Sequence, residues 1–320
     1  MTKFMTDQGR TCFLYESGTY ASTSGARQWI GLVQSHDATP NMNVIPIRYQ
    51  GSTDRNVDTF ADGVQEWNGT INYFPQDWKF LGFAIGSIQD VTGSHIFTET
   101  NSDNCVQIGS VPLYHFTIED SKNTGTAGEN FIRTLIGGMV DSYQITYTQG
   151  ELVSAEVGYI AQSETFSSGA VTALAETTTK PYVFNNVRLD IPSGTQVDNL
   201  REGTFRVNNN LERGFYLNGS RVAKELLPMN REYEVTNTCV MQPGNAGSFY
   251  HNYYIIGSEF NAMLMFRGVA GSLTVIMSGC KMTDMTVPSP LEGVQEQSFT
   301  FTPQHCYPIA YDSIAKYNLL

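Results

Sequence analysis

The sequence predicts a mainly β protein made of two tandem β domains, and three observations lead to this prediction. Charged residues make up only 16% of the 320 residues, whereas aromatic residues reach 12%. Thr, Ser, Asn, Gln and Gly replace the missing charges, and such residues suit strands with one solvated face and many turns. The third observation is a β-hairpin pattern at residues 137–162, which returns in a weaker form from residue 279.

Apolar side chains fall on every second position of this hairpin, as expected of half-buried strands. The core face carries Tyr143, Ile145, Tyr147, Val157 and Tyr159. The opposite polar face carries Ser142, Gln144, Thr146, Ser154 and Glu156. The alternation itself predicts that this polar face meets water.

A shift of 142 residues places this hairpin on residues 279–304 without a gap, so that Gly137 meets Gly279. The core-face positions of the second copy are then Met285, Val287, Phe299 and Phe301. Upstream, Glu66-Trp67 aligns with Glu232-Tyr233 only at a different offset, which implies an insertion within residues 88–125. The pattern favours duplication of a β domain, but two unrelated amphipathic hairpins would also share their alternation.

The elements between the hairpins follow from local patterns. Trp67, Ile71 and Tyr73 alternate with polar residues, which predicts a strand, although Asn68-Gly69 would also suit a tight turn. Asp77 is a suitable N-cap for a short helix at residues 78–85, and we expect another short helix at residues 222–230.

The expected organisation follows from the repeat and from a Ser/Thr-rich segment before Pro181. It comprises an N-terminal arm at 1–40, a first β domain at 41–162, a linker at 163–180, a second β domain at 181–310 and a C-terminal tail at 311–320.

Composition and motifs argue against several classes of function. The net charge of −12 and the absence of a basic run oppose specific nucleic-acid binding. The five histidines are isolated and the five cysteines form no CxxC pair, so we expect buried reduced thiols and no metal site, cofactor or catalytic residue. No apolar run has the length of a signal peptide or membrane span, so neither is expected.

Three segments resemble the tail tube proteins of long-tailed phages and related tailed viruses, including those of archaea. They are "GSTDRNVDTFADGVQEWNGTINYFPQDWKFLGFAIGS", the hairpin "GGMVDSYQITYTQGELVSAEVGYIAQ" and "FRVNNNLERGFYLNGSR". Together they cover most of residues 41–304.

This resemblance implies a β-sandwich or half-barrel whose strands join those of neighbouring copies in a ring-shaped inner barrel. Rings would stack into a tube through which DNA passes without specific binding. The polar face of the hairpin would then line the lumen of the tube, with exposure on the outside of the tube as the alternative. Two domains per chain imply a homotrimeric ring with pseudo-sixfold symmetry, with a ring of six chains as the alternative. Other partners would be terminator and baseplate or tip proteins, and assembly would take place in the host cytoplasm.

A second hypothesis is a non-catalytic β-sandwich binding module, such as a virion adhesin or a carbohydrate-binding protein. In this case Trp67, Trp78 and the tyrosines at 250–254 would stack on sugars.

Overall fold

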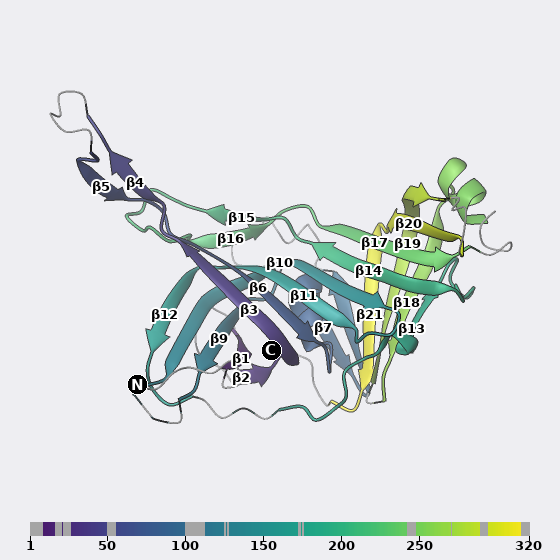
Figure 1. Cartoon of the computed structure of the whole chain (residues 1–320), viewed down its shortest axis with the longest axis horizontal. Helices are drawn as coiled ribbons and strands as arrows, with labels where there is room; N and C mark the ends of the chain where they lie inside the picture. Colours follow the sequence, from purple (N-terminus) through teal and green to yellow (C-terminus); the bar gives the residue numbers. More distant parts are fainter. Residues whose placement is uncertain are drawn as a thin grey trace.

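The computed structural model describes residues 9–16, 21, 27–49, 56–99, 113–124, 126, 128–171, 174, 176–241, 248–269, 271–288 and 294–314. These residues form a mainly β structure in which one long inner sheet packs against two outer sheets (Figure 1).

The inner sheet consists of eight antiparallel strands. In spatial order they are β3 (Leu32–Asn41), β6 (Glu66–Phe74), β11 (Ser154–Ala161), the second half of β10 (Phe131–Thr148), β14 (Leu200–Asn208), β17 (Glu232–Val240), β20 (Glu296–Thr302) and the second half of β19 (Gly271–Thr286). The hairpin found in the sequence is therefore β10–β11, and its weaker copy is β19–β20.

Each outer sheet is built around the first half of one long strand. The first contains β2 (Arg27–Trp29), β1 (Gly9–Tyr15), β9 (Phe116–Lys122), β10 and β12 (Ser163–Ser167). The second contains β13 (Val187–Asp190), β18 (Phe260–Arg267), β19, β21 (His305–Asp312), β8 (Ser94–Glu99) and β7 (Gly86–Val91).

Two separate hairpins and four short helices complete the described fold. The hairpins are β4 (Val44–Ile47) with β5 (Thr59–Asp62), and β15 (Leu211–Gly214) with β16 (Glu225–Pro228). The helices are η2 (Lys79–Leu81), α1 (Gly82–Ile85), η4 (Phe184–Asn186) and η5 (Ser248–Ile255).

Strands β10 and β19 pass from an outer sheet into the inner sheet at matching glycines. Gly137 has φ = 68° and Gly279 has φ = 61°, a left-handed conformation in which a side chain is unfavourable. The carboxylate of buried Glu16 fixes the first crossing: it accepts hydrogen bonds from the Gly137 amide at 2.7 Å and from the Thr117 hydroxyl at 2.6 Å.

Aromatic side chains fill the space between the sheets. Phe80 and Phe83, from η2 and α1, contact Phe13 and Phe116 in edge or tilted geometry at centroid distances of 5.1–5.5 Å. Trp78 packs between Tyr182 and Phe266. Because Phe266 lies on β18, this contact joins the two halves of the chain in one hydrophobic core.

The irregularities of the inner sheet occur twice at matching places. A bulge between Val140 and Ser142 in β10 corresponds to one between Met282 and Asp284 in β19. A bulge in β3 after Val33 likewise corresponds to one in β14 after Leu200. Strands β3, β6, β11 and β10 therefore repeat, in order and register, as β14, β17, β20 and β19.

The structure resolves the local alternatives left by the sequence. Residues 66–74 form the single strand β6, and the expected helix before residue 86 is present as η2 and α1. The helix expected at 222–230 is wrong: residues 225–228 form β16 because Leu226 is buried while Leu227 is exposed, an alternation that pairing with β15 stabilises.

Several segments expected to lie outside the domains also pair with them. Within the expected arm, residues 32–40 belong to β3, and the first residues of the expected linker form β12. The expected insertion contains β8, which pairs with β21 of the second half. His95 of β8 is buried there, with its ring nitrogens 2.6 Å from Asp90 and 3.2 Å from Asp312.

We expect Glu16→Ala to lower the free energy of unfolding by about 3 kcal/mol, because it leaves a buried amide and a buried hydroxyl without their acceptor. Unfolding in urea measures the effect. The exposed Glu259→Ala should change it by less than about 0.5 kcal/mol. Equal effects of the two variants would show that Glu16 does not hold the crossing.

Candidate assembly surface

One face of the inner sheet is polar along most of its strands, and the β15–β16 hairpin covers the part around Met139 and Ile160. Ser142, Gln144, Thr146 and Ser154 are half-buried on this face, and Glu156 is exposed. The registers place acidic side chains on the same face, namely Asp37, Glu66, Glu156, Glu202, Glu232, Glu234, Asp284 and Glu296. The basic side chains described there are Arg201, Arg206 and Lys281, and Arg201 pairs with Glu296 at 3.0 Å. The face is therefore wet and acidic.

The opposite face of the inner sheet forms one wall of the core. The expected core-face residues that are buried are Trp67, Ile71, Tyr73, Tyr143, Ile145, Tyr147, Val157, Tyr159, Met285, Phe299 and Phe301. Val287 is only partly buried, because it lies at the unpaired side of the sheet. The Tyr73 and Tyr143 hydroxyls share a hydrogen bond of 2.7 Å, and Tyr147 donates one of 2.6 Å to Asn237, so these buried hydroxyls are satisfied.

Strands β3 and β19 are the two end strands of the inner sheet, and the described residues place no strand on the outer side of either. Strand β14, the counterpart of β3 inside the chain, shows which backbone groups of β3 point away from the sheet. Next to β14, the Asn209 amide donates to the Asp141 carbonyl at 2.7 Å, and the Gln149 amide donates to that of Arg201 at 2.8 Å. By the alternation of antiparallel ladders, the outward backbone groups of β3 belong to His36, Ala38, Pro40 and Met42; among them, the Ala38 carbonyl already accepts a hydrogen bond from Arg133 at 3.3 Å.

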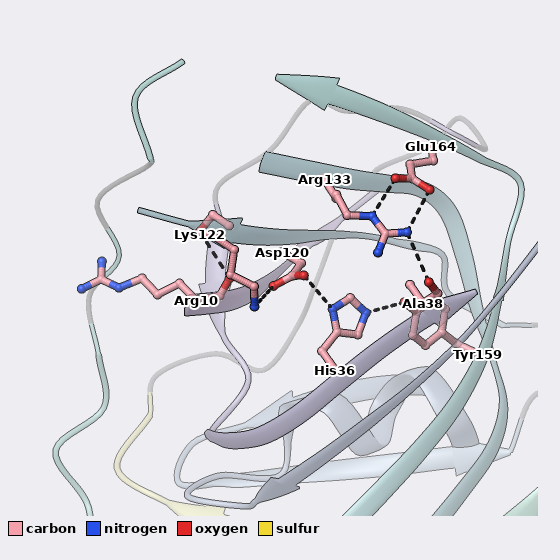
Figure 2. Close-up of polar contacts among 9 residues, drawn as sticks. Arg10, His36, Ala38, Asp120, Lys122, Arg133, Tyr159 and Glu164 are labelled. Carbon is pink, nitrogen blue, oxygen red and sulfur yellow. Dashed lines mark hydrogen bonds and ion pairs between the residues drawn. The ribbon is translucent and has the colours of Figure 1, made fainter. Parts of the chain in front are cut away.

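A polar network holds the end strand β3 against the first outer sheet (Figure 2). Arg133 on β10 binds both carboxylate oxygens of Glu164 on β12, at 2.7 and 3.0 Å, and donates to the Ala38 carbonyl at 3.3 Å. His36 lies between the two sheets, with Nε2 2.6 Å from the Tyr159 hydroxyl and Nδ1 3.7 Å from Asp120. The bidentate ion pair and these contacts fix the position of the end strand.

The charges of this network shift the pKa of Asp120. Burial alone would raise that pKa, but the nearby imidazole of His36 and the ammonium group of Lys122 outweigh burial and hold it below the ordinary value of 3.8. Asp120 therefore stabilises the folded state in its ionised form.

The matching positions of the second half contain no such network, because apolar residues replace its members. By the registers, Leu264 stands where Asp120 does, Val275 where Arg133 does, and Phe301 where Tyr159 does. Sequence patterns missed the network, since its members lie on the five strands β3, β9, β10, β11 and β12 and the partners of His36 are distant in the sequence.

The aromatic platform of the alternative hypothesis is not present as expected. Trp67 and Trp78 are buried in the core, with 6% and 1% of their surface exposed, so neither can stack on a sugar. Of the tyrosines at 250–254, Tyr250 is exposed, whereas Tyr253 and Tyr254 pack partly against the core.

The described residues hold no group of three or more potential metal ligands, and none of their helices is long and apolar enough to span a bilayer. The described cysteines are buried and unpaired, and burial raises the pKa of Cys12 and Cys280 to about 12, unlike that of a reactive thiol.

Comparison of the sequence with known protein families gives a match. A family model described as phage tail tube protein matches residues 22–303, which is most of the chain. A search of curated proteins found no match.

We expect Asp120→Asn to weaken the dependence of stability on acidic pH. Because the pKa of Asp120 is lowered by folding, its contribution is present above the ordinary value of 3.8 and is lost as pH falls through the folded value. Urea unfolding at pH 7 and pH 3 should thus show a smaller loss of stability for Asp120→Asn than for the native chain. The exposed Asp37→Asn is the control, and equal losses for Asp120→Asn and the native chain would contradict the assignment.

Proposed function

Since the chain belongs to the phage tail tube protein family, we propose that this structural protein of the virion tail closes into rings that stack as a conduit for DNA. The observation that carries the proposal is the match between the junction inside the chain and its two free edges. β10 and β14 join the two halves of the inner sheet, and β19 and β3 are their counterparts at its ends.

The β10–β14 junction supplies a register for pairing between copies. Tyr143 lies opposite Val207 and Ile145 lies opposite Phe205. Transferred to the free edges, Met285 of one copy lies opposite Pro40 of the next, and Val287 lies opposite Ala38. All of these positions face the core, so the pairing continues both the hydrogen-bond ladder and the apolar wall.

Pro40 modifies this junction, because it lacks the amide hydrogen that Val207 offers to β10. The pairing between copies therefore has one hydrogen bond fewer than the pairing inside the chain. Proline on an end strand also hinders indiscriminate strand addition, which favours a subunit that stays soluble until the specific neighbour docks.

We infer that the two halves arose by duplication of one β domain, given their matching order and bulges. Three copies then provide six equivalent units, and a head-to-tail contact that closes gives a trimeric ring with pseudo-sixfold symmetry. A ring of six chains would double the number of strands around the channel.

The polar face of the inner sheet would line the channel of such a ring. Its acidic side chains repel phosphates, and its few basic residues offer little opportunity to neutralise them. DNA would therefore pass without being held. Ser142, Gln144, Thr146, Ser154 and Glu156 would contribute to this lining, while terminator and baseplate or tip proteins close the two ends of a tube assembled in the host cytoplasm.

Cysteine pairs at the two junctions test the ring. Ser142 and Asn208 lie directly opposite each other inside the chain, and their counterparts between copies are Asp284 and Asn41. We expect Asp284→Cys/Asn41→Cys to form disulfides between chains under mild oxidation, since directly opposed Cβ atoms lie within bonding range. Ser142→Cys/Asn208→Cys is the matched control and should react within one chain.

Non-reducing electrophoresis and negative-stain microscopy of the same samples give the result. Covalent products that stop at the number of copies in a visible ring support the proposal. A chain that remains monomeric at high concentration, or rings in which this pair does not react while the control does, would contradict the proposed junction.

A further inference from the structure

The β4–β5 hairpin carries apolar side chains that the other described residues do not cover. It extends away from the body of the molecule, at the upper left of Figure 1. Phe60 is 65% exposed, Ile45 54% and Val44 52%. By the register of β4 with β5, Val44 and Phe60 lie on one face of the hairpin and Ile45 lies on the other. Exposed apolar side chains on a projecting hairpin mark a contact surface.

The β15–β16 hairpin is the counterpart of β4–β5, and it is docked. Leu226 is only 4% exposed and packs with Met139 and Ile160 of the first half. Polar contacts support this packing: the Gln162 amide donates to the Ala223 carbonyl at 2.9 Å, and Arg213 donates to Asn68. The hairpin of the second half thus lies on the first half, across the β10–β14 junction.

Both hairpins leave the inner sheet through the same turn. Asn43 and Asn210 have φ values of 43° and 47°. Asn41 donates to the Asn43 side chain at 3.0 Å, as Asn208 does to that of Asn210 at 3.0 Å. The Asn43 side chain donates to the Val64 carbonyl, just before β6, at 3.1 Å. The Asn210 side chain donates in the same way to the Asn230 carbonyl, just before β17, at 2.9 Å. The two hairpins therefore start in the same direction relative to their halves.

The second half has a hollow where the first half holds the docked hairpin. It has a volume of about 340 Å³ and is lined by Arg206, Asn208, Glu232, Tyr233, Glu234 and Thr302. Thr302 is the counterpart of Ile160, and Glu234 is the counterpart of Asn68. The contact sites of β15–β16 on the first half thus correspond to a surface on the second half that the described residues leave uncovered.

We propose that the β4–β5 hairpin docks into this hollow on the neighbouring copy of the same chain within one ring. This proposal rests on the ring described above and adds a second contact to it. The hairpin then crosses the junction between copies just as β15–β16 crosses the junction inside the chain. Phe60 of one copy takes the place that Leu226 has inside the chain. It contacts Thr302 and the alkyl stem of Lys281 on the neighbouring copy, which are the counterparts of Ile160 and Met139.

The chemistry of the two surfaces is complementary. The hollow is more polar than the site beneath β15–β16, and Phe60 is aromatic where Leu226 is aliphatic. The cationic groups of Lys281 and Arg206 suit the face of an aromatic ring. Gln304, the exposed counterpart of Gln162, is placed to donate to the Val57 carbonyl as Gln162 donates to that of Ala223.

A disulfide between chains tests the docking directly. Phe60→Cys/Thr302→Cys should yield covalent products that stop at the number of copies in the ring. Phe60→Cys/Glu151→Cys is the negative control, because the exposed Glu151 lies at the opposite end of the sheet. Leu226→Cys/Ile160→Cys is the positive control within one chain, and the single variants account for native thiols.

Loss of the ring at the centre of the contact provides a second readout. Phe60→Ala removes the aromatic side chain that contacts Thr302 and the stem of Lys281, and we expect the concentration needed for ring assembly to rise by about tenfold. Leu217→Ala, at the exposed turn of the other hairpin, should leave it unchanged. An unchanged assembly concentration for Phe60→Ala would contradict the docking.

The outcomes separate this proposal from the ring itself. Rings that react through Asp284→Cys/Asn41→Cys but not through Phe60→Cys/Thr302→Cys overturn the docking and leave the ring intact. Products that extend beyond the copies of one ring assign the hairpin to a neighbouring ring and also overturn it. Absence of rings overturns the proposed function together with this contact.

Discussion

Unpaired backbone groups at the two ends of an eight-stranded sheet are the constraint on which this structure depends. A sheet edge offers hydrogen bonds that water satisfies only in part, and a long apolar wall ends beside it. In this chain β3 and β19 end the same sheet, and both match strands that already pair with each other inside the molecule. The β10–β14 pairing inside the chain is thus the model for the contact that the end strands β19 and β3 of neighbouring copies would make.

The rest of the fold keeps these end strands in place. Gly137, Gly279 and Glu16 fix the crossings that carry β10 and β19 between sheets. The aromatic core makes the two halves one body. On β3, Arg133 and Glu164 immobilise the strand from one side. A prearranged edge loses little conformational entropy on pairing.

The sequence predicted much of the inner sheet because its signal is local. Alternation identified β6 and the β10–β11 hairpin, and the resemblance indicated the family, which the match over residues 22–303 confirms. The network around His36 could not be found in this way, since Asp120 and Arg133 reach it only through long-range pairing. Residues 225–228 were mistaken for helix because helix-forming residues predominate there, whereas contacts of Leu226 with the first half decide the outcome.

Electron cryomicroscopy of the assembled protein tests the central claim most directly, because it shows the backbone at the border between two copies. We expect a continuous antiparallel ladder there, with Met285 of one copy opposite Pro40 of the next, around a channel lined by the polar face. A map in which both end strands are covered by segments of their own chain, or in which the polar face lies outside, would contradict it.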